Sequence, residues 1–317
     1  MKPYLQNRET HQIKRNTETS FILQWRATPS GSIYAGGLQR GRALKTCHSE
    51  FRHASGTASP FFTMIFYFSG TGNSAWVAQQ LGEALHEAVH RITDKLPNQI
   101  YTLQPRERLG FVFPVYSWGP PSVVLEWLAR LLCSETPSYL YFVCTCGDDA
   151  GKTALLFRKV AERRGWVCKA GFSVTMPNTY VCLPGFDVDS VEVEKQKICD
   201  ARSRIVQVIE WVDRKVSRFD CHEGGAPYTK SYLLRPLFNR FFVSAARFHV
   251  METCISCGKC EQACPMHNIQ MKEGKPEWGS QCSMCLACYH HCPKHAVAYG
   301  NQTRKKGQYI FKSPKPV

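Results

Sequence analysis

The stretch that decides the C-terminal fold is Cys254-Ile-Ser-Cys257-Gly-Lys-Cys260-Glu-Gln-Ala-Cys264-Pro265. It returns as Cys282-Ser-Met-Cys285-Leu-Ala-Cys288-Tyr-His-His-Cys292-Pro293. Both copies follow C-x₂-C-x₂-C-x₃-C-P, and each cysteine of the second copy lies 28 residues after its counterpart. This regular offset indicates an internal duplication, which predicts two similar sites related by a pseudo-twofold axis.

The cysteine spacing suits an iron–sulfur cubane. Three thiolates separated by two residues each can curl around one [4Fe–4S] cluster, while the fourth cysteine, followed by proline, leads away and reaches the other cluster. The prediction is therefore two clusters with exchanged fourth ligands: Cys254, Cys257, Cys260 and Cys292 for one, and Cys282, Cys285, Cys288 and Cys264 for the other. A pair of zinc sites is the alternative; zinc protein is colourless, whereas a cubane protein is brown.

A second motif, Ser69-Gly70-Thr71-Gly72-Asn73-Ser74, lies between an apolar run and a stretch with helical periodicity. Hydroxyls and glycines at a strand-to-helix turn form a cradle for an anion, because the helix N-terminus supplies free N–H donors and the positive end of its dipole. The loop has no G-K-[ST], which excludes a nucleotide-hydrolysing P-loop. All six residues are candidate cofactor-binding positions.

The pattern around this loop predicts an α/β domain. Apolar runs alternate with helical stretches, and continuous apolar strands favour a parallel sheet covered on both faces. The predicted strands are Ile65–Phe68, Leu109–Tyr116, Tyr139–Thr145 and Trp166–Val174, with a weaker one at Ala88–Thr93. The predicted helices are Ser74–Ala88, Ser122–Cys133, Lys152–Arg164 and a long amphipathic helix that includes Ile198 to Val216.

Two resemblances follow from these motifs. The cysteine-rich segment resembles the bacterial two-cluster ferredoxins, and the hydroxyl-rich loop resembles the flavodoxin phosphate loop, [ST]-x-T-G-x-[ST]. Together they imply a flavodoxin-like doubly wound parallel sheet of order 2-1-3-4-5, followed by a small α+β two-cluster ferredoxin domain. In that strand order FMN binds at the switch point, where the loops after three strands meet. The later loops would supply Tyr116, Ser117, Trp118, Gly119, Gly147 and Asp148.

Either Tyr116 or Trp118 could stack on the flavin ring, although Trp118 could equally pack in the core. The loop Thr145–Gly151 offers no aromatic residue, unlike many flavodoxins. Residues 64 to about 300 resemble the flavodoxin–ferredoxin fusion proteins of anaerobic prokaryotes. The resemblance implies an electron-transfer protein that relays electrons between FMN and two [4Fe–4S] clusters. The alternatives are a flavin-dependent reductase that draws electrons from the clusters, and a flavin-free binding protein.

The expected organisation has five parts: a disordered basic extension that could reflect a mis-assigned start (1–63), the flavodoxin-like domain (64–220), a linker or helix (221–250), the ferredoxin domain (251–300) and a basic tail (301–317). The 221–250 stretch is expected to pack the two domains together, and a membrane-surface helix is the alternative. The net charge of +15 is concentrated partly in the extension, so redox partner proteins are expected rather than nucleic acid.

Sixteen cysteines without a secretory signal favour metal ligation over disulfides, and no apolar run is long enough for a membrane span. A soluble, cytoplasmic electron carrier is expected, rather than a substrate-specific enzyme. The eight cysteines outside the motifs are interpreted as buried small side chains. His290 and His291 are expected at the surface.

Overall fold

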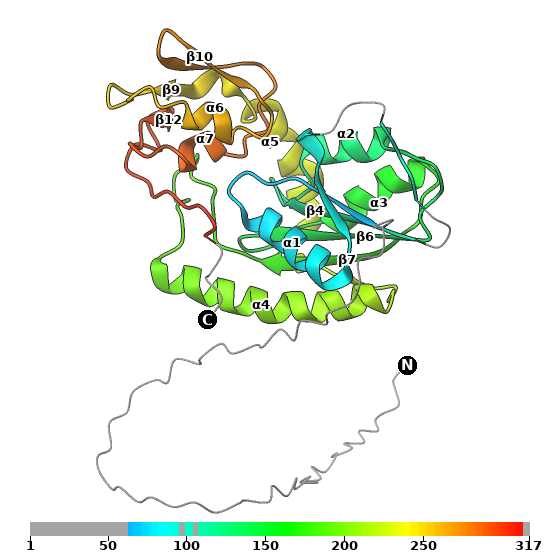
Figure 1. Ribbon diagram of the computed structural model, residues 1–317. Coiled ribbons are helices and arrows are strands. Elements are labelled where there is room, and N and C mark those ends of the chain that lie inside the picture. The colour runs from blue at the N-terminus through cyan, green and yellow to red at the C-terminus, as the bar shows by residue number, and fades with distance from the viewer. Residues whose placement is uncertain (1–62, 95–98, 104–106, 313–317) are drawn as a thin grey trace, which may run out of the picture. The chain divides into compact units, whose positions relative to one another are not determined.

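The computed structural model describes residues 63–94, 99–103 and 107–312, which belong to one compact unit spanning Cys47–Val317. The extension predicted for residues 1–63 lies outside the described residues except for Thr63, as do residues 313–317 of the tail. Figure 1 shows a sheet flanked by helices, with a smaller cysteine-containing module beside it.

The sheet has six parallel strands in the order β2-β1-β4-β6-β7-β8. Their bounds are β1 Met64–Tyr67, β2 Ala88–Arg91, β4 Arg108–Pro114, β6 Tyr139–Cys146, β7 Cys168–Thr175 and β8 Phe219–Asp220. The first five strands confirm the flavodoxin order predicted from the sequence. The short edge strand β8 was not predicted, because two residues carry no recognisable strand pattern.

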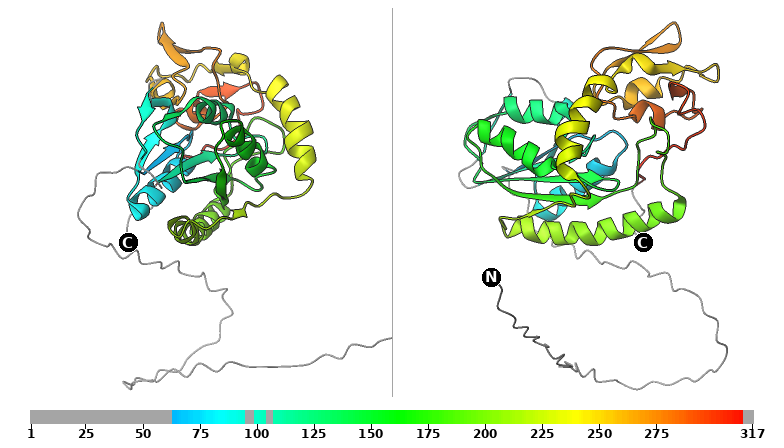
Figure 2. Two further views of the ribbon diagram at one scale, coloured as in Figure 1. Left: turned by 90° about the vertical axis from the view of Figure 1, so that its right-hand side faces the viewer. Right: turned by 180° about the vertical axis from the view of Figure 1, so that it is seen from behind.

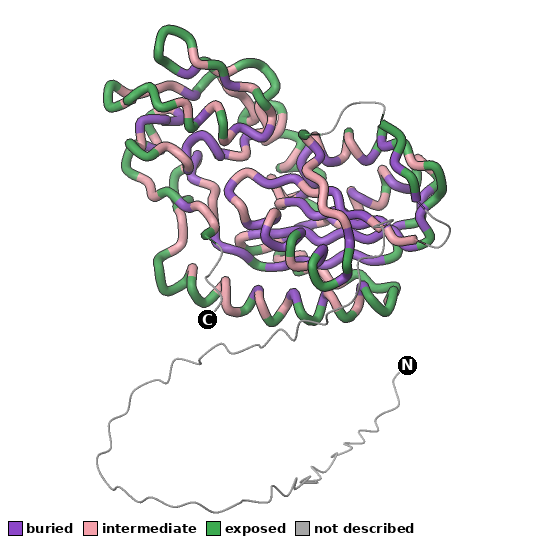
Figure 3. The backbone as a smooth tube through the Cα atoms, viewed as in Figure 1, coloured by how far each residue is buried: buried purple, intermediate pink, exposed green. Residues whose placement is uncertain are grey.

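Two hydrophobic cores lie on opposite faces of this sheet. Neighbouring residues of β6 alternate between them, so that Phe142 packs in one core and Val143 in the other. Helices α2 (Ser122–Arg130) and α3 (Thr153–Arg163) contribute to the Phe142 core, whereas α1 (Asn73–Leu85) and α4 (Val191–Asp213) contribute to the Val143 core. Burial of both faces explains why the strands are continuously apolar, and Figure 3 shows the buried sheet inside more exposed helices.

Helix boundaries differ from the sequence prediction where the backbone turns. Helix α1 ends at Leu85, three residues before the predicted end at Ala88, because His86 adopts the left-handed conformation with φ 53°. Ala88 is thereby free to begin β2. Helix α4 begins earlier than its apolar periodicity indicated, and the Ser190 hydroxyl caps it by accepting a hydrogen bond from Val193 N–H at 3.4 Å.

Smaller elements complete the α/β domain. A 3₁₀ turn, η1, spans Ile92–Asp94, and a separate parallel pair joins β3 (Ile100–Tyr101) to β5 (Leu132–Cys133). Within the part of the chain that the structure describes, no helix has the length and apolarity needed to cross a bilayer.

The connecting segment, residues 221–247, is helical rather than extended. It contains the π-helix η2 (Thr229–Leu234), α5 (Arg235–Phe241) and a 3₁₀ turn, η3 (Ala245–Arg247). Figure 2, right, shows the yellow helix running between the sheet and the smaller module. Phe238 on α5 makes an edge-on aromatic contact with Tyr180 of the α/β domain at 5.9 Å between ring centroids. This contact agrees with the prediction of a helix packed between the two domains.

The cysteine module, residues 248–300, is a small α+β unit. Strand β9 (Phe248–Val250) pairs antiparallel with β12 (Val297–Tyr299), and β10 (Ile269–Lys272) forms a hairpin with β11 (Lys275–Trp278). The short helices α6 (Lys259–Ala263) and α7 (Ala287–His290) follow the two cysteine loops. This arrangement fits a ferredoxin domain.

The backbone repeats the duplication seen in the sequence. Left-handed residues recur at positions 28 apart: Ser256 and Met284, Gly258 and Leu286, and His267 and His295. Most residues other than glycine rarely adopt this conformation, so a shared set of such positions reflects a shared loop geometry. The two cysteine loops therefore have the same local fold despite their different side chains.

Candidate functional site

A cavity of about 630 Å³ lies where the loops after β1, β4, β6 and β7 meet the cysteine module. Eight of the twelve predicted cofactor positions line it, namely Ser69, Gly70, Thr71, Asn73, Ser74, Tyr116, Ser117 and Gly147. The other four, Gly72, Trp118, Gly119 and Asp148, do not line it. This volume lies within the usual range for sites that hold a small molecule or cofactor.

The first loop is shaped as an anion cradle. Gly72 adopts φ 103°, which permits the tight turn into α1, and its N–H donates to Ser69 Oγ at 3.2 Å. The Ser74 hydroxyl is held 2.8 Å from Thr145 Oγ1, which ties the loop to the end of β6. Because the first N–H groups of α1 have no acceptor within the helix, they are available to a phosphate at this end of the cavity.

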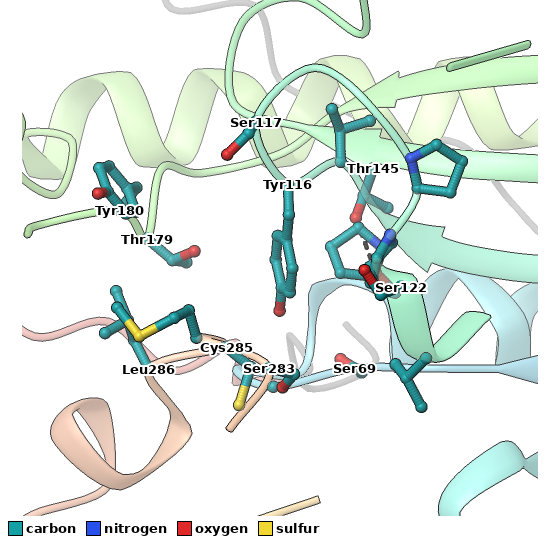
Figure 4. A pocket seen from close by; sticks show the side chains of 18 of the residues that line it. Ser69, Tyr116, Ser117, Ser122, Thr145, Thr179, Tyr180, Ser283, Cys285 and Leu286 are labelled. Carbon is teal, nitrogen blue, oxygen red and sulfur yellow. Dashed lines mark hydrogen bonds between the residues drawn. The ribbon is translucent and has the colours of Figure 1, made fainter. Parts of the chain in front are cut away.

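The second loop turns one aromatic residue inward and the next one away. Ser117 and Trp118 are both left-handed, and Tyr116 and Gly119 exchange backbone hydrogen bonds of 2.9 and 3.2 Å across them. Tyr116 therefore points into the cavity (Figure 4). Trp118 instead faces the Lys230 ammonium at 5.7 Å, so of the two stacking candidates only Tyr116 is in position.

The third loop is closely covered by its neighbour. A Cβ on Gly147 would lie 1.6 Å from Asn178 Oδ1, so only glycine fits there. The Asn178 amide is held in turn by Asp189, to which its Nδ2 donates at 3.2 Å. Asp148 points outward with 79% of its side chain exposed, and this explains why it does not line the cavity.

Three further contributors to the cavity escaped sequence analysis. The loop after β7 supplies Tyr180, and α5 supplies Arg235 and Phe238. Arg235 packs against Gly119, where a Cβ would lie 2.2 Å from its Nε, and its Nη2 donates to Pro120 O at 2.5 Å. The only available signal was that β7 ends at the same sheet edge as the other predicted loops, which places residues 176–180 there.

The second cysteine loop forms the opposite wall. A Cβ on Gly70 would lie 2.7 Å from the Cys285 carbonyl oxygen, so the phosphate loop and the cysteine loop are in direct contact. Burial raises the pKa of Tyr116 well above its ordinary value, and the neighbouring Cys285 and Cys282 raise it further. The Tyr116 hydroxyl therefore stays protonated and lies between the cavity and this cysteine loop (Figure 4).

A chain of hydrogen bonds fastens the cysteine module to the phosphate loop. Tyr309 of the tail donates its hydroxyl proton to Asn73 Oδ1 at 2.9 Å, and its backbone N–H donates to His290 Nδ1 at 3.1 Å. The other ring nitrogen of His290 lies 2.8 Å from Thr179 O. Residues 301–312 thus connect the two modules, and Phe311 extends the contact by stacking on Trp76 at 4.9 Å.

His290 corrects a prediction. Its expected position at the surface is wrong, because only 3% of the residue is exposed. Burial lowers its pKa to about 4, although the Thr179 carbonyl opposes this shift. A neutral imidazole that donates from Nε2 and accepts at Nδ1 satisfies both partners.

The eight motif cysteines gather around two hollows in the predicted groups. One hollow is lined by Cys254, Cys257, Cys260 and Cys292, and the other by Cys264, Cys282, Cys285 and Cys288. We call these the outer and the inner cysteine site. Each site takes three cysteines from one loop and the fourth from the other loop, as the spacing predicted.

The inner site has donors suited to a group rich in acceptors. Trp278 Nε1 and Ser283 Oγ are buried without a hydrogen-bond partner, and both residues line this hollow. Cluster sulfurs accept such bonds, and hydrogen bonds to them tune the reduction potential. Among the described residues, no group of three or more His, Cys, Asp or Glu side chains has the geometry that would hold a single metal ion.

Backbone N–H groups approach the cysteine sulfurs in matched positions. Asn268 N–H donates to Cys264 Sγ at 3.4 Å, and Ala296 N–H, 28 residues later, donates to Cys292 Sγ at 3.1 Å. These bonds favour the thiolate, whereas burial raises the pKa of Cys285 to about 12. Since metal ligands must be thiolates, loading the inner site has to release its protons.

The remaining cysteines fall into three groups. Cys144, Cys146, Cys168 and Cys182 are buried, which agrees with their interpretation as small core side chains. Cys133, Cys199 and Cys221 are half-buried, and Cys47 lies outside the described residues.

Comparison with known proteins supports the module assignment. Residues 253–297 match the family model described as a 4Fe-4S dicluster domain. This match covers both cysteine motifs and supports iron–sulfur binding by the C-terminal module. A search of curated proteins found no match to the chain.

Several solved structures are similar to the α/β part. A flavoprotein from Bacteroides uniformis is 12% identical, with 37% of this chain and 92% of that chain covered and a TM-score of 0.29. The Trp repressor binding protein from Bacillus subtilis is 12% identical, with 49% and 97% covered and a TM-score of 0.29. A flavodoxin, WrbA-like protein from Agrobacterium tumefaciens is 14% identical, with 47% and 96% covered and a TM-score of 0.25. These scores are too low to carry an argument, so the fold assignment rests on the strand order.

Proposed function

We propose that the protein transfers electrons between a flavin in the cavity and two [4Fe–4S] clusters held at the inner and outer cysteine sites. The observation that carries the proposal is the contact between Gly70 of the phosphate loop and Cys285 of the inner site. A cofactor held by the first loop would lie against the second. Electron transfer between adjacent cofactors requires no other chemical group from the protein.

The flavin is proposed to be FMN. Ser69 and Thr71 and the N-terminus of α1 would bind its phosphate, and Tyr116 would lie against its ring. Tyr180, from the loop after β7, provides a second aromatic side chain that the loop Thr145–Gly151 lacks. When bound, FMN supplies chemistry that accepts a pair of electrons and releases them one at a time, whereas each cubane carries one electron.

The contribution of the chain is to position these groups and exclude water. Tyr116 stays protonated and fills the space between the cavity and the inner site. The bonds from Tyr309 to Asn73 and His290 hold the two modules at a fixed separation. A rigid link suits electron transfer, because the cofactors need not move between steps.

The first experiment measures composition. Protein purified without oxygen should contain about eight irons, about eight sulfides and about one FMN per chain, as expected for two cubanes and one flavin site. Zinc in place of iron would exclude the proposal. Failure to bind FMN even after reconstitution would favour a flavin-free binding protein.

The exchanged ligands can be tested by combining variants. Cys257→Ala should lose the outer cluster and leave about four irons. Adding Cys292→Ala should remove no more iron, because both residues belong to the same site. Adding Cys264→Ala instead should reduce iron toward zero, because it damages the remaining site. Equal losses in the two double variants would contradict the assignment.

The transfer step needs a separate measurement. After the clusters are reduced by rapid mixing with a one-electron reductant, the flavin absorbance should bleach in a first-order step that does not depend on protein concentration. An oxidised flavin that persists beside reduced clusters would refute the relay. Steady turnover of a defined small molecule would favour the reductase alternative.

A further inference from the structure

The two cysteine loops share a backbone geometry, yet their surroundings differ at every compared position. In the inner loop Met284, Leu286 and Ala287 are buried. Their counterparts in the outer loop, 28 residues earlier, are exposed Ser256, half-buried Gly258 and exposed Lys259. The duplication therefore provides an internal comparison: one loop packs against the α/β domain and the other faces solvent.

The cysteines show the same asymmetry. Cys257 is exposed, whereas its counterpart Cys285 is half-buried and in contact with Gly70. Ile255, beside Cys257, is 56% exposed, which leaves an apolar side chain in water directly over the outer site. An exposed apolar residue next to a redox centre suits a transient protein contact, since such contacts exclude water at their centre.

The charges around the outer site are mainly positive. Lys259 and Lys294 line the outer hollow and are exposed, and neither ammonium forms an ion pair with any residue that the structure describes. Glu252 is the exposed carboxylate of the same loop, and it offsets only one of the two. The corresponding positions of the inner loop are Ala287 and, before the repeat, Met266, so the inner site has no equivalent ammonium pair.

We propose that the outer site is the electron port for a partner protein, and that the partner is a one-electron carrier whose acidic face contacts Lys259 and Lys294. The proposal rests on the proposed relay and assigns a direction within it: partner, outer cluster, inner cluster, cavity. In the first step the partner loses one electron and the outer cluster gains it, with no bond made or broken and no proton transferred.

Small redox probes of opposite charge test the port. One is a bis-propylsulfonate viologen, whose reduced radical is an anion, and the other is methyl viologen, whose reduced radical is a cation. The double variant Lys259→Glu/Lys294→Glu should slow cluster reduction by the anionic radical about tenfold at low salt, and should speed reduction by the cationic radical. Both effects should fade as ionic strength rises.

Lys169→Glu/Lys195→Glu is the matched control. It changes the net charge equally, but both exposed lysines lie in the α/β domain. Its rates with both radicals should stay within about twofold of wild type, because charges beyond the screening length contribute little. Iron and flavin contents of both double variants should equal those of wild type, which would exclude misfolding as the cause.

The outcomes separate this proposal from the relay. Equal effects of the two double variants, or no effect of either, would overturn the port. So would flavin bleaching that precedes cluster bleaching. Charge-dependent cluster reduction in a protein whose flavin then stays oxidised would support the port and refute the relay alone.

Discussion

Replacing Gly70 with alanine should force the phosphate loop and the inner cysteine loop apart. The new Cβ would lie 2.7 Å from the Cys285 carbonyl oxygen and 2.9 Å from Cys285 Cβ. Ordinary contacts begin near 3.4 Å, so one loop must move by roughly 0.7 Å, the difference between 3.4 and 2.7 Å. Both partners are backbone or directly attached to it, so no flexible side chain can absorb the shift.

The expected cost follows from overpacking. Extra methyl groups in well-packed sites typically cost about 1–3 kcal/mol, and we expect Gly70→Ala to lower the free energy of unfolding by that amount. Amide hydrogen exchange should accelerate in residues 282–286, because their packing against the α/β domain loosens. The iron content should stay at about eight per chain, since no ligand is changed. Electron exchange between clusters and flavin should slow.

Gly225→Ala provides the control. No atom lies within 4 Å of a Cβ built at Gly225, so this substitution should leave stability, exchange and electron transfer unchanged. If Gly70→Ala behaves like Gly225→Ala in all three measurements, the two loops are not in contact, and the reasoning that joins flavin to inner site fails.

Three further predictions concern the phosphate loop, a buried ion pair and the iron. Thr71→Val should weaken FMN binding about tenfold in a fluorescence titration while leaving riboflavin, which lacks the phosphate, unaffected. Burial holds the pKa of Glu87 above 4.5 even beside Arg108, so its contribution to stability is full below that pH and declines as the carboxyl ionises. Arg108→Met should raise this pKa further and cost about 3 kcal/mol in urea unfolding at neutral pH, less in acid, whereas Arg158→Met, in an exposed pair with Glu162, should cost under about 0.5 kcal/mol. Removing the iron with an oxidant and a chelator should accelerate amide exchange in residues 248–300 and spare the sheet, because cysteines make up much of that module's core.

The sequence alone determined the local features. Cysteine spacing predicted both ligand groups, including the exchange of Cys264 and Cys292, because short spacings restrict where neighbouring thiolates can point. The hydroxyl-rich turn and the apolar runs predicted the phosphate loop and the first five strands, since both depend on periodicity over a few residues.

Only the tertiary structure decided what the two modules do to each other. Tyr309 and Asn73 are hydrogen-bonded across 236 positions of sequence, and no local pattern specifies such a pair. His290 reads like a surface residue until the α/β domain covers it. The duplicated loops carry the same cysteine code, and their inequivalence arises from what packs on each: Gly70 against Cys285, and solvent against Cys257. Local geometry is encoded by near neighbours, whereas burial is a property of the assembled chain.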